Sequence, residues 1–385
     1  MDLRGTYKGG GGPDKTLLNS AALHDKSRVN VLVTYLRSPG DKEFNIDIRA
    51  KELRLNYTDI YDRSFIDFKC LLKLRKAVKE NGISLVHAHD DKTLLYGRLL
   101  KLLIPGLKIM YTCHSHSCYK RSDFKSKNGY FRYFLRERVQ IFLMKQYNKP
   151  VITVSEDTKR RLVGNGLPSH CIEVLYNGID TLFWNKDKGD PVLRNELGVP
   201  DRGYLIGTVA RITYDKDLPT FYKVAKKVSL EMPNVVFVIV GGGYGDELEL
   251  ARKEVERLGL KDTVKFTGHR SDLHNIYASL DVFLMTSITE GLPNTTLEAM
   301  AMSVPVVSTS IGGVPELVIH GKTGFLSEIR DSEGLSRQII ELLKNHNLRN
   351  EFALAGRKRV EESFDFYSRV KKMEDYYEKF GRKEI

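Results

Sequence analysis

Short apolar runs alternate with longer amphipathic stretches along the chain from Val29 onward. The runs have the length of buried strands, and the stretches between them place apolar residues at helical spacing. This alternation predicts a parallel sheet with helices on both of its faces. The runs that we expect to be strands are 29–35, 84–87, 108–113, 151–154, 204–210, 235–240, 264–267, 282–286, 304–308 and 324–326. The clearest helical stretches are 217–231, 246–258, 295–301 and 334–345.

The alternating pattern occurs twice, which predicts two domains. A single hydrophobic core rarely grows beyond roughly 250–300 residues, and this chain has 385. The pattern breaks near 176–190, where Asn177-Gly178-Ile179-Asp180 precedes a charged run. The predicted fold class is α/β, with two doubly wound Rossmann-like domains that face each other across a cleft. We expect an N-terminal domain at 1–176, a C-terminal domain at 177–363, and a helix at 364–385 that crosses back toward the N-terminal domain.

The first residues of the chain do not follow the pattern. The glycine run Gly9–Gly12 needs a strand before it, but the preceding residues are not strand-like. We expect either a short, irregular first strand or a chain that has lost its natural beginning. The run nearly matches a phosphate-binding P-loop, yet Asp14 stands in the place of its second glycine, which disfavours nucleotide hydrolysis. A flexible turn remains possible, but we favour glycines that let the backbone approach a ligand before a helix at 16–23.

Positive charge is concentrated in the first half of the chain. The formal net charge is +12, and residues 1–200 contribute 35 Lys and Arg against 22 Asp and Glu. Such an excess favours an acidic partner, which can be a phosphate, a nucleic acid or an anionic membrane. The four cysteines indicate no disulfide framework, and no apolar run approaches the ~18–20 residues of a membrane span. We expect a soluble, cytoplasmic protein without a secretory signal.

A basic, aromatic segment gives this charge a candidate role. Residues Tyr119–Lys149 hold nine Lys and Arg, two acidic residues and eight aromatic residues. Helices of this composition lie on anionic bilayers. A helix that packs into the core with one solvated face is the alternative. We expect contact with an anionic membrane surface through this segment, and hence a peripheral location on the inner face of the membrane.

Two glutamates form the most informative motif of the second half. They enclose the sequence Glu290-Gly291-Leu292-Pro293-Asn294-Thr295-Thr296-Leu297-Glu298, which follows the strand expected at 282–286. Asn294 is a good N-cap for the next helix, and a helix N-terminus attracts anions. The two carboxylates can then grip hydroxyl groups on either side of a bound anion. A capped surface helix is the alternative if the motif stands alone.

A second group of residues is placed to bind the same anion. Arg211 ends Gly207-Thr208-Val209-Ala210-Arg211 at the close of the strand expected at 204–210, and Lys216 follows it. Two cations at the carboxyl end of a strand suit a diphosphate. Asp215-Lys216-Asp217 contains the metal-binding pattern D-x-D, but it overlaps this cationic pair and we discount it. The run Gly241–Gly245 lacks the last glycine of a dinucleotide fingerprint, although its strand–loop–helix context still favours a ligand.

Cysteine and histidine residues cluster at Cys113-His114-Ser115-His116-Ser117-Cys118. Four candidate ligands within six residues do not converge easily on one tetrahedral ion. His114 follows a strand, so we expect it to face the cleft instead. We therefore predict neither a metal nor a cofactor.

Together these motifs resemble the retaining glycosyltransferases of the GT-B fold, specifically family 4, glycosyl transferases group 1. The similarity spans nearly the whole chain and is strongest over 204–326. The family often has a glycine after the lysine of the diphosphate motif, where this chain has Asp217. The residues that carry the resemblance are Glu290, Glu298, Arg211, Lys216, Gly241, Asn177, Gly178, Thr267, Gly268, His269, Gly11 and Gly12.

The resemblance implies a nucleotide-sugar donor in the C-terminal domain and an acceptor in the N-terminal domain. It implies transfer on one face of the sugar without a divalent metal, with the leaving phosphate helping to deprotonate the acceptor. The implied catalytic residues are His114, Arg211, Lys216 and Glu290. The implied donor-binding residues are Gly11, Gly12, Gly268, His269, Arg270, Gly291, Leu292, Pro293, Asn294 and Glu298.

We expect a saccharide or lipid-linked saccharide acceptor, as in the biosynthesis of surface polysaccharides or glycolipids. A sugar-nucleotide epimerase of the same fold and a non-catalytic partner subunit remain as alternatives. A nucleic-acid-binding protein is compatible with the charge, but no recognised binding module is visible and we expect no nucleic acid.

Overall fold

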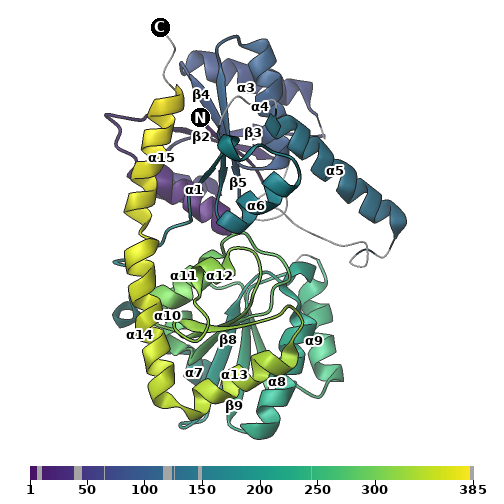
Figure 1. The fold of residues 1–385 in the computed structure, drawn as a ribbon, viewed down its shortest axis with the longest axis vertical. Coiled ribbons are helices and arrows are strands. Elements are labelled where there is room, and N and C mark those ends of the chain that lie inside the picture. Colours follow the sequence, from purple (N-terminus) through teal and green to yellow (C-terminus); the bar gives the residue numbers. More distant parts are fainter. Residues whose placement is uncertain are drawn as a thin grey trace. The chain divides into compact units, whose positions relative to one another are not determined.

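The computed structural model describes residues 1–6, 11–38, 46–64, 66–115, 124, 126–145, 150–243 and 245–381 (Figure 1). The chain divides into two compact units. The first contains Met1–Asn177 and Tyr367–Ile385, and the second contains Gly178–Phe366. The boundary between the two units lies between Asn177 and Gly178, at the start of the predicted break near 176–190.

The first unit is a parallel sheet of seven strands in the order β3-β2-β1-β4-β5-β6-β7. Helices that alternate with the strands cover it, so its central strands are buried on both faces. The strands are β1 (Asp2–Thr6), β2 (Leu32–Arg37), β3 (Asn56–Tyr61), β4 (Leu85–Ala88), β5 (Lys108–Cys113), β6 (Val151–Thr153) and β7 (Ile172–Val174). The helices are α1 (Gly12–Leu23), α2 (Ile46–Glu52), α3 (Phe68–Glu80), α4 (Asp91–Leu103), α5 (Lys127–Lys145), α6 (Glu156–Gly164) and α15 (Phe366–Gly381).

The start of the chain corrects the sequence prediction. The expectation that the first residues are not strand-like is wrong, because β1 is a regular strand between β2 and β4. All five of its residues pair in register with β2, and Leu3 is fully buried. The central place of β1 in the sheet outweighs the weak strand propensity of its polar residues and of Gly5.

The second unit is a parallel sheet of six strands in the order β10-β9-β8-β11-β12-β13. Its strands are β8 (Tyr204–Val209), β9 (Val235–Val240), β10 (Val264–Gly268), β11 (Val282–Met285), β12 (Val306–Thr309) and β13 (Gly324–Ser327). Its longer helices are α8 (Leu218–Glu231), α9 (Glu247–Arg257), α10 (Leu273–Ser279), α11 (Asn294–Ala301), α13 (Ser332–Lys344) and α14 (His346–Ser363). The predicted strands of this half each coincide with an observed one to within two residues.

The last helix, α15, packs on the sheet of the first unit. Met373 and Tyr377 share a buried cluster with residues of β4, β5 and β6. Arg28 forms ion pairs of 2.8–3.0 Å with Glu374, Asp375 and Glu378 of this helix. The helix is therefore an integral part of the first unit although it follows the second in sequence. None of the helices that the structure describes is both long and apolar enough to cross a membrane.

Candidate active site

Both sheets have the strand order in which a ligand site is expected beside the first strand. In an open parallel sheet the order reverses at one point, and ligands bind there, at the carboxyl ends of the strands. In the second unit this point lies between β8 and β11. Arg211 and Lys216 follow β8, and Glu290 and Glu298 follow β11. The sheet therefore brings both predicted motifs to one edge.

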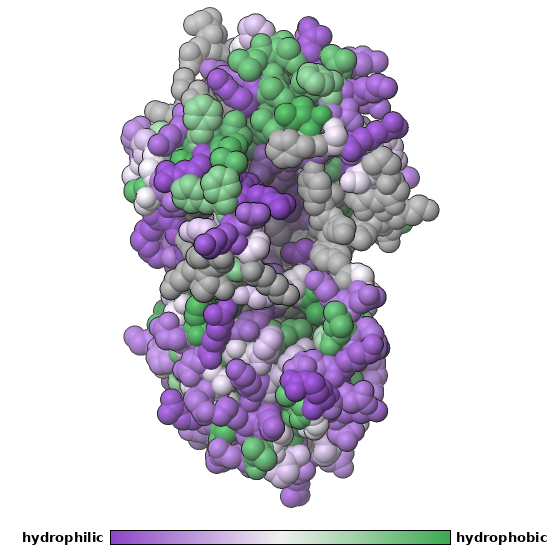
Figure 2. Space-filling view, turned by 90° about the vertical axis from the view of Figure 1, so that its right-hand side faces the viewer, coloured by the Kyte–Doolittle hydropathy of each residue, from purple (hydrophilic) through white to green (hydrophobic). Residues whose placement is uncertain are grey.

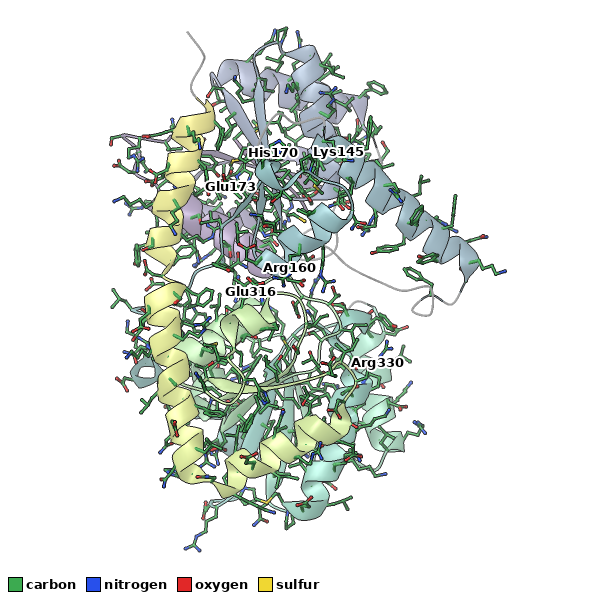
Figure 3. The ribbon with its side chains drawn as sticks, in the orientation of Figure 1. Lys145, Arg160, His170, Glu173, Glu316 and Arg330 are labelled. Carbon is green, nitrogen blue, oxygen red and sulfur yellow. The ribbon has the colours of Figure 1, made fainter. Side chains whose placement is uncertain are left out.

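The loop after β8 takes a path that a glycine would favour. Tyr214–Lys216 form one 3₁₀ turn, and Asp217 has φ +47°, in the left-handed region. Asp tolerates this conformation better than most residues, and its carboxylate accepts a hydrogen bond of 2.5 Å from Thr220 Oγ1. From the loop after β13, Arg330 Nη2 lies 3.4 Å from the hydroxyl of Tyr214 (Figure 3). Asp217 thus holds the left-handed conformation that a glycine adopts readily.

Lys216 is held by two carboxylates. Its Nζ lies 2.7 Å from Glu290 Oε1 and 3.1 Å from Asp215 Oδ2. Burial lowers the pKa of Lys216, but the attraction of Glu290 and Asp215 outweighs burial and raises the pKa above its ordinary value. The side chain is therefore an ammonium that is already fixed in position. Asp215, the first residue of the D-x-D pattern, therefore forms an ion pair with the lysine inside that pattern.

The loop that carries Glu290 is fixed by backbone contacts on both sides. Ile288 N–H donates to the carbonyl of Asp215 at 2.9 Å, and Gly313 N–H donates to the carbonyl of Gly291 at 2.7 Å. Gly312 has φ +56°, and a Cβ at this position would lie only 2.1 Å from the carbonyl oxygen of Glu290. The close approach of these loops requires glycine there. Leu292 and Pro293, in the same loop, are buried.

Glu298 lies inside α11 and is buried. The hydroxyl of Tyr277, on α10, is 2.8 Å from Glu298 Oε2 and fixes that carboxylate. Tyr277 is fully buried, and sequence reasoning missed it because nothing in its surroundings distinguishes it from a core tyrosine. The prediction that Asn294 is the N-cap is wrong. The N-cap is Pro293, and Asn294 is the first helical residue, because the tight turn before it fixes Pro293 in an extended conformation.

The residues expected around a base divide into three kinds. Gly268 has φ +69°, and its carbonyl accepts a hydrogen bond from Gly241 N–H at 2.9 Å. His269 is exposed. Arg270 forms ion pairs of 2.7 Å with both Glu196 and Asp272. Hydrogen bonds from Arg270 to Asp272 and then to Glu196 raise its pKa further above its ordinary value. Arg270 therefore stabilises the folded loop, and a ligand would have to compete with two carboxylates for it.

Gly11 and Gly12 open α1 in the first unit, while Gly9 and Gly10 lie outside the described residues. Gly11 is the N-cap, and Asp14 Oδ2 accepts a hydrogen bond from its N–H at 2.8 Å. Asp14 also pairs with Arg4 Nε at 2.5 Å and accepts a bond from the hydroxyl of Tyr35. The aspartate that excluded a P-loop therefore holds α1 to β1 and β2.

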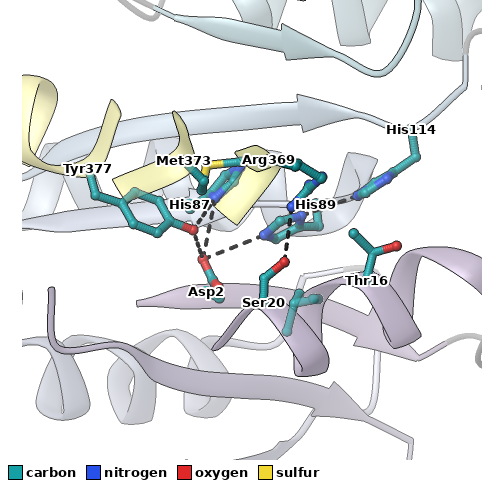
Figure 4. A pocket seen from close by; sticks show the side chains of 10 residues that line it. Asp2, Thr16, Ser20, His87, His89, His114, Arg369, Met373 and Tyr377 are labelled. Carbon is teal, nitrogen blue, oxygen red and sulfur yellow. Dashed lines mark hydrogen bonds and ion pairs between the residues drawn. The ribbon is translucent and has the colours of Figure 1, made fainter. Parts of the chain in front are cut away.

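His114 follows β5 and meets a group of polar residues in the interior of the first unit. A cavity of about 10 Å³ is lined by residues of β1, α1, β4 and α15, and this is room for one water molecule. Figure 4 shows Asp2 beside His87, His89 and Tyr377, with His114 beyond His89. His116 and Cys118 of the cysteine–histidine cluster lie outside the described residues. Sequence reasoning missed this group, for which the His-x-His spacing of His87 and His89 at the end of β4 is the one available signal.

Three of these side chains are close enough together to hold a metal ion. The candidate ligand atoms of Asp2, His87 and His89 lie within 4.8 Å of one another. However, Asp2 and His87 both bond the hydroxyl of Tyr377, and His87 also bonds Thr112. The ligand atoms of Asp2 and His87 are thus already used in hydrogen bonds, whereas Nε2 of His89 has no hydrogen-bond partner among the described residues.

Part of the basic, aromatic segment forms helix α5. Residues 119–123, 125 and 146–149 of the predicted membrane segment lie outside the described residues. The buried residues of α5 are confined to its C-terminal third, from Gln140 to Met144, near the labelled Lys145 (Figure 3). The remainder of the helix exposes hydrophobic side chains as well as basic ones. The exposed hydrophobic residues are Phe131, Phe134, Leu135, Val139 and Phe142.

Comparison with known proteins agrees with this architecture. Residues 190–359 match the family described as glycosyl transferases group 1, and residues 10–182 match glycosyltransferase family 4. The UDP-Gal:alpha-D-GlcNAc-diphosphoundecaprenol alpha-1,3-galactosyltransferase of Escherichia coli is 26% identical over 88% of this chain and 89% of its own. The capsular polysaccharide biosynthesis glycosyltransferase CapM of Staphylococcus aureus is 26% identical over 82% of each chain.

A solved structure shares the whole fold. Anabaena HepE, crystallised in complex with UDP-glucose, aligns with a TM-score of 0.82 at 21% identity, over 98% of this chain and 99% of its own. Two doubly wound parallel sheets in one chain are the GT-B architecture. The chain belongs to glycosyltransferase family 4. The alternative of a sugar-nucleotide epimerase gains no support from its relatives.

Proposed function

We propose that this chain transfers a sugar, with retention at the anomeric carbon and without a divalent metal, from a nucleoside diphosphate sugar to a saccharide or lipid-linked acceptor. The observation that carries the proposal is the pre-positioned ammonium of Lys216 at the switch point of the second unit. The Escherichia coli relative is named for a UDP-Gal donor and a GlcNAc-diphosphoundecaprenol acceptor. This name supports the proposed classes of donor and acceptor.

The chemistry requires the bond between the anomeric carbon and the diphosphate oxygen to break. The electron pair of this bond stays with the diphosphate, so negative charge develops there. Arg211 and Lys216 stabilise that charge from fixed positions. Glu298 binds the ribose hydroxyls, and Glu290 contacts the transferred sugar. The acceptor hydroxyl attacks on the face that the diphosphate leaves, and its proton passes to the departing phosphate oxygen.

Binding of nucleotides tests the proposed donor site. We expect saturable binding of one among UDP, GDP and ADP in isothermal titration calorimetry, with the same affinity in the presence of a strong chelator. Exposed Arg211 is the partner of Lys216 in this site, and Arg211→Ala should weaken binding of that nucleotide about tenfold. If none of the three nucleotides binds, the transferase proposal fails and a non-catalytic partner subunit becomes the better account.

We propose further that the protein is peripheral on the cytoplasmic face of a membrane and docks there through the first unit. Hydrophobic side chains gather on this unit in Figure 2. Helix α4 packs against both α3 and α5. They expose Phe68, Leu72, Leu102, Leu103, Phe131, Leu135 and Phe142. Basic residues of α5, such as Arg132 and Arg138, are also exposed. An exposed apolar surface with cations beside it favours an anionic bilayer.

Replacing Phe131 and Phe142 together with serine should abolish most binding to vesicles that contain phosphatidylglycerol. The exposed fraction is 63% for Phe131 and 60% for Phe142, so the replacement costs little folding stability. Burying one such side chain in the interface contributes ~1–2 kcal/mol, so the double variant should bind at least tenfold more weakly. Vesicle flotation at low salt measures the effect.

The matched control replaces two exposed leucines of the second unit, Leu230 and Leu250, with serine. This control should leave flotation unchanged. Equal loss in both variants, or no binding of the unmodified protein to anionic vesicles, would refute docking through the first unit. Equal binding to vesicles of phosphatidylcholine alone would refute the contribution of the basic residues.

A further inference from the structure

A chain of buried polar side chains runs through the first unit and ends at His114 (Figure 4). Its links join Thr112 to His87 at 2.7 Å, His87 to the hydroxyl of Tyr377 at 2.8 Å, and that hydroxyl to Asp2 at 2.7 Å. Asp2 then lies 3.6 Å from Nε2 of His89, and Nδ1 of His89 lies 3.2 Å from Nε2 of His114. Among these residues, the family resemblance implies a catalytic role for His114 alone.

The carboxylate of Asp2 fixes the order of the hydrogen bonds at the first end. A carboxylate only accepts hydrogen bonds, so the single hydroxyl proton of Tyr377 points to Asp2. The oxygen of Tyr377 must then accept a bond from Nδ1–H of His87. The other ring nitrogen of His87 is left without a proton and accepts the hydroxyl proton of Thr112.

The same carboxylate decides the arrangement at the second end. Nε2 of His89 lies 3.6 Å from Asp2 Oδ1, which is longer than a hydrogen bond, but a lone pair facing this carboxylate would be repelled. Nε2 of His89 therefore carries the proton, and its Nδ1 has the lone pair. Nδ1 can only accept a bond from Nε2–H of His114. The second ring nitrogen of His114, Nδ1, is thereby left with a free lone pair, and this buried atom has no hydrogen-bond partner among the described residues.

The surroundings keep both rings neutral, as this order requires. Burial, aided by the neighbouring His87, lowers the pKa of His89 to about 3. Burial and the positive charge of Arg4 lower the pKa of His114 well below its ordinary value. Arg369, from α15, also faces this group and donates to Ser20 Oγ at 2.9 Å. A second proton on either ring would add a cation between Arg4 and Arg369.

We propose that Asp2 and His89 are positioning residues which fix His114 as the Nε2–H tautomer, so that its Nδ1 accepts a hydrogen bond from a substrate hydroxyl. This inference rests on the proposed function and on the catalytic role at the sugar that the family resemblance implies for His114. His114 then orients the sugar as an acceptor of a hydrogen bond and does not act as a base.

The test compares two replacements of His89. In His89→Gln, the amide NH₂ can donate to Asp2 while the amide oxygen accepts from His114, so the direction of the bonds is preserved. In His89→Leu, no group accepts the proton of His114. We expect His89→Leu to lower kcat about tenfold, the factor that one hydrogen bond corresponds to, without changing the Kd for UDP. His89→Gln should recover most of that loss.

Heteronuclear NMR of isotope-labelled histidine reports the tautomer without any substrate. Nε2 of His114 should be protonated and Nδ1 unprotonated in the unmodified protein and in His89→Gln. Thr112→Val, which changes only the far end of the chain, is the matched control and should alter neither the tautomer nor kcat.

Each other outcome identifies a different error. If His89→Gln is as impaired as His89→Leu, or if His114 is protonated at Nδ1, the positioning role is wrong. A stoichiometric metal ion in the purified protein would show that Asp2, His87 and His89 bind metal instead. If the protein neither binds a nucleotide nor transfers a sugar, the proposed function fails, while the NMR measurement still tests the tautomer.

Discussion

Replacing Lys216 with alanine should lower kcat/KM for sugar transfer about a thousandfold. Removing one pre-positioned electrostatic contact to the developing charge costs about 10²–10³ in rate, and this ammonium is already held in place by Glu290 and Asp215. The same change leaves Glu290 without its cation, so the sugar contact should weaken as well. Steady-state kinetics with the nucleotide sugar identified by calorimetry provides the measurement.

The matched control for this variant is Lys261→Ala. Lys261 belongs to the same unit, lies 3.5 Å from Glu256 and is 76% exposed. Its replacement should leave kcat/KM within about twofold, since exposed ion pairs contribute little. Melting temperatures of both variants exclude unfolding as the cause. A loss of less than tenfold for Lys216→Ala would show that the diphosphate is stabilised elsewhere.

The sequence predicted the architecture because buried parallel strands are apolar throughout. The strands at 108–113 and 235–240 have the predicted bounds, and both consist largely of buried apolar residues. The three strands that were missed lack this signal. Strand β3, Asn-Tyr-Thr-Asp-Ile-Tyr, lies at the edge of its sheet, and β7 has only three residues. Strand β1 is held by its two neighbours in the sheet, which no local pattern reveals.

The candidate site could be predicted only as far as strand ends define it. Lys216 and Glu290 each follow a strand, and the parallel sheet brings their loops together although the two residues are 74 positions apart in sequence. The ion pair itself, the occupation of Arg270 by two carboxylates and the support of Glu298 by Tyr277 depend on side-chain packing. Residues such as Asp2 and His89 acquire a role only through contacts with one another, so their types alone did not identify them.

Replacing Glu298 with glutamine should raise the Kd for the bound nucleotide about 10–100-fold. A hydrogen bond to a charged group contributes ~1.5–3 kcal/mol, and the carboxylate can accept bonds from the ribose hydroxyls that a neutral amide accepts less strongly. The hydroxyl of Tyr277 holds Glu298 Oε2 at 2.8 Å, so Tyr277→Phe should weaken binding in the same direction but only several-fold, because the carboxylate itself remains.

Glu249→Gln is the control for both variants. Glu249 lies on the exposed surface of α9, and its replacement should leave nucleotide binding unchanged. Calorimetry with the intact nucleotide and with its 2′-deoxy and 3′-deoxy forms makes the contact specific: Glu298→Gln should lose the discrimination among the three. If the variant keeps this discrimination while binding more weakly, Glu298 does not bind the ribose and its effect is structural.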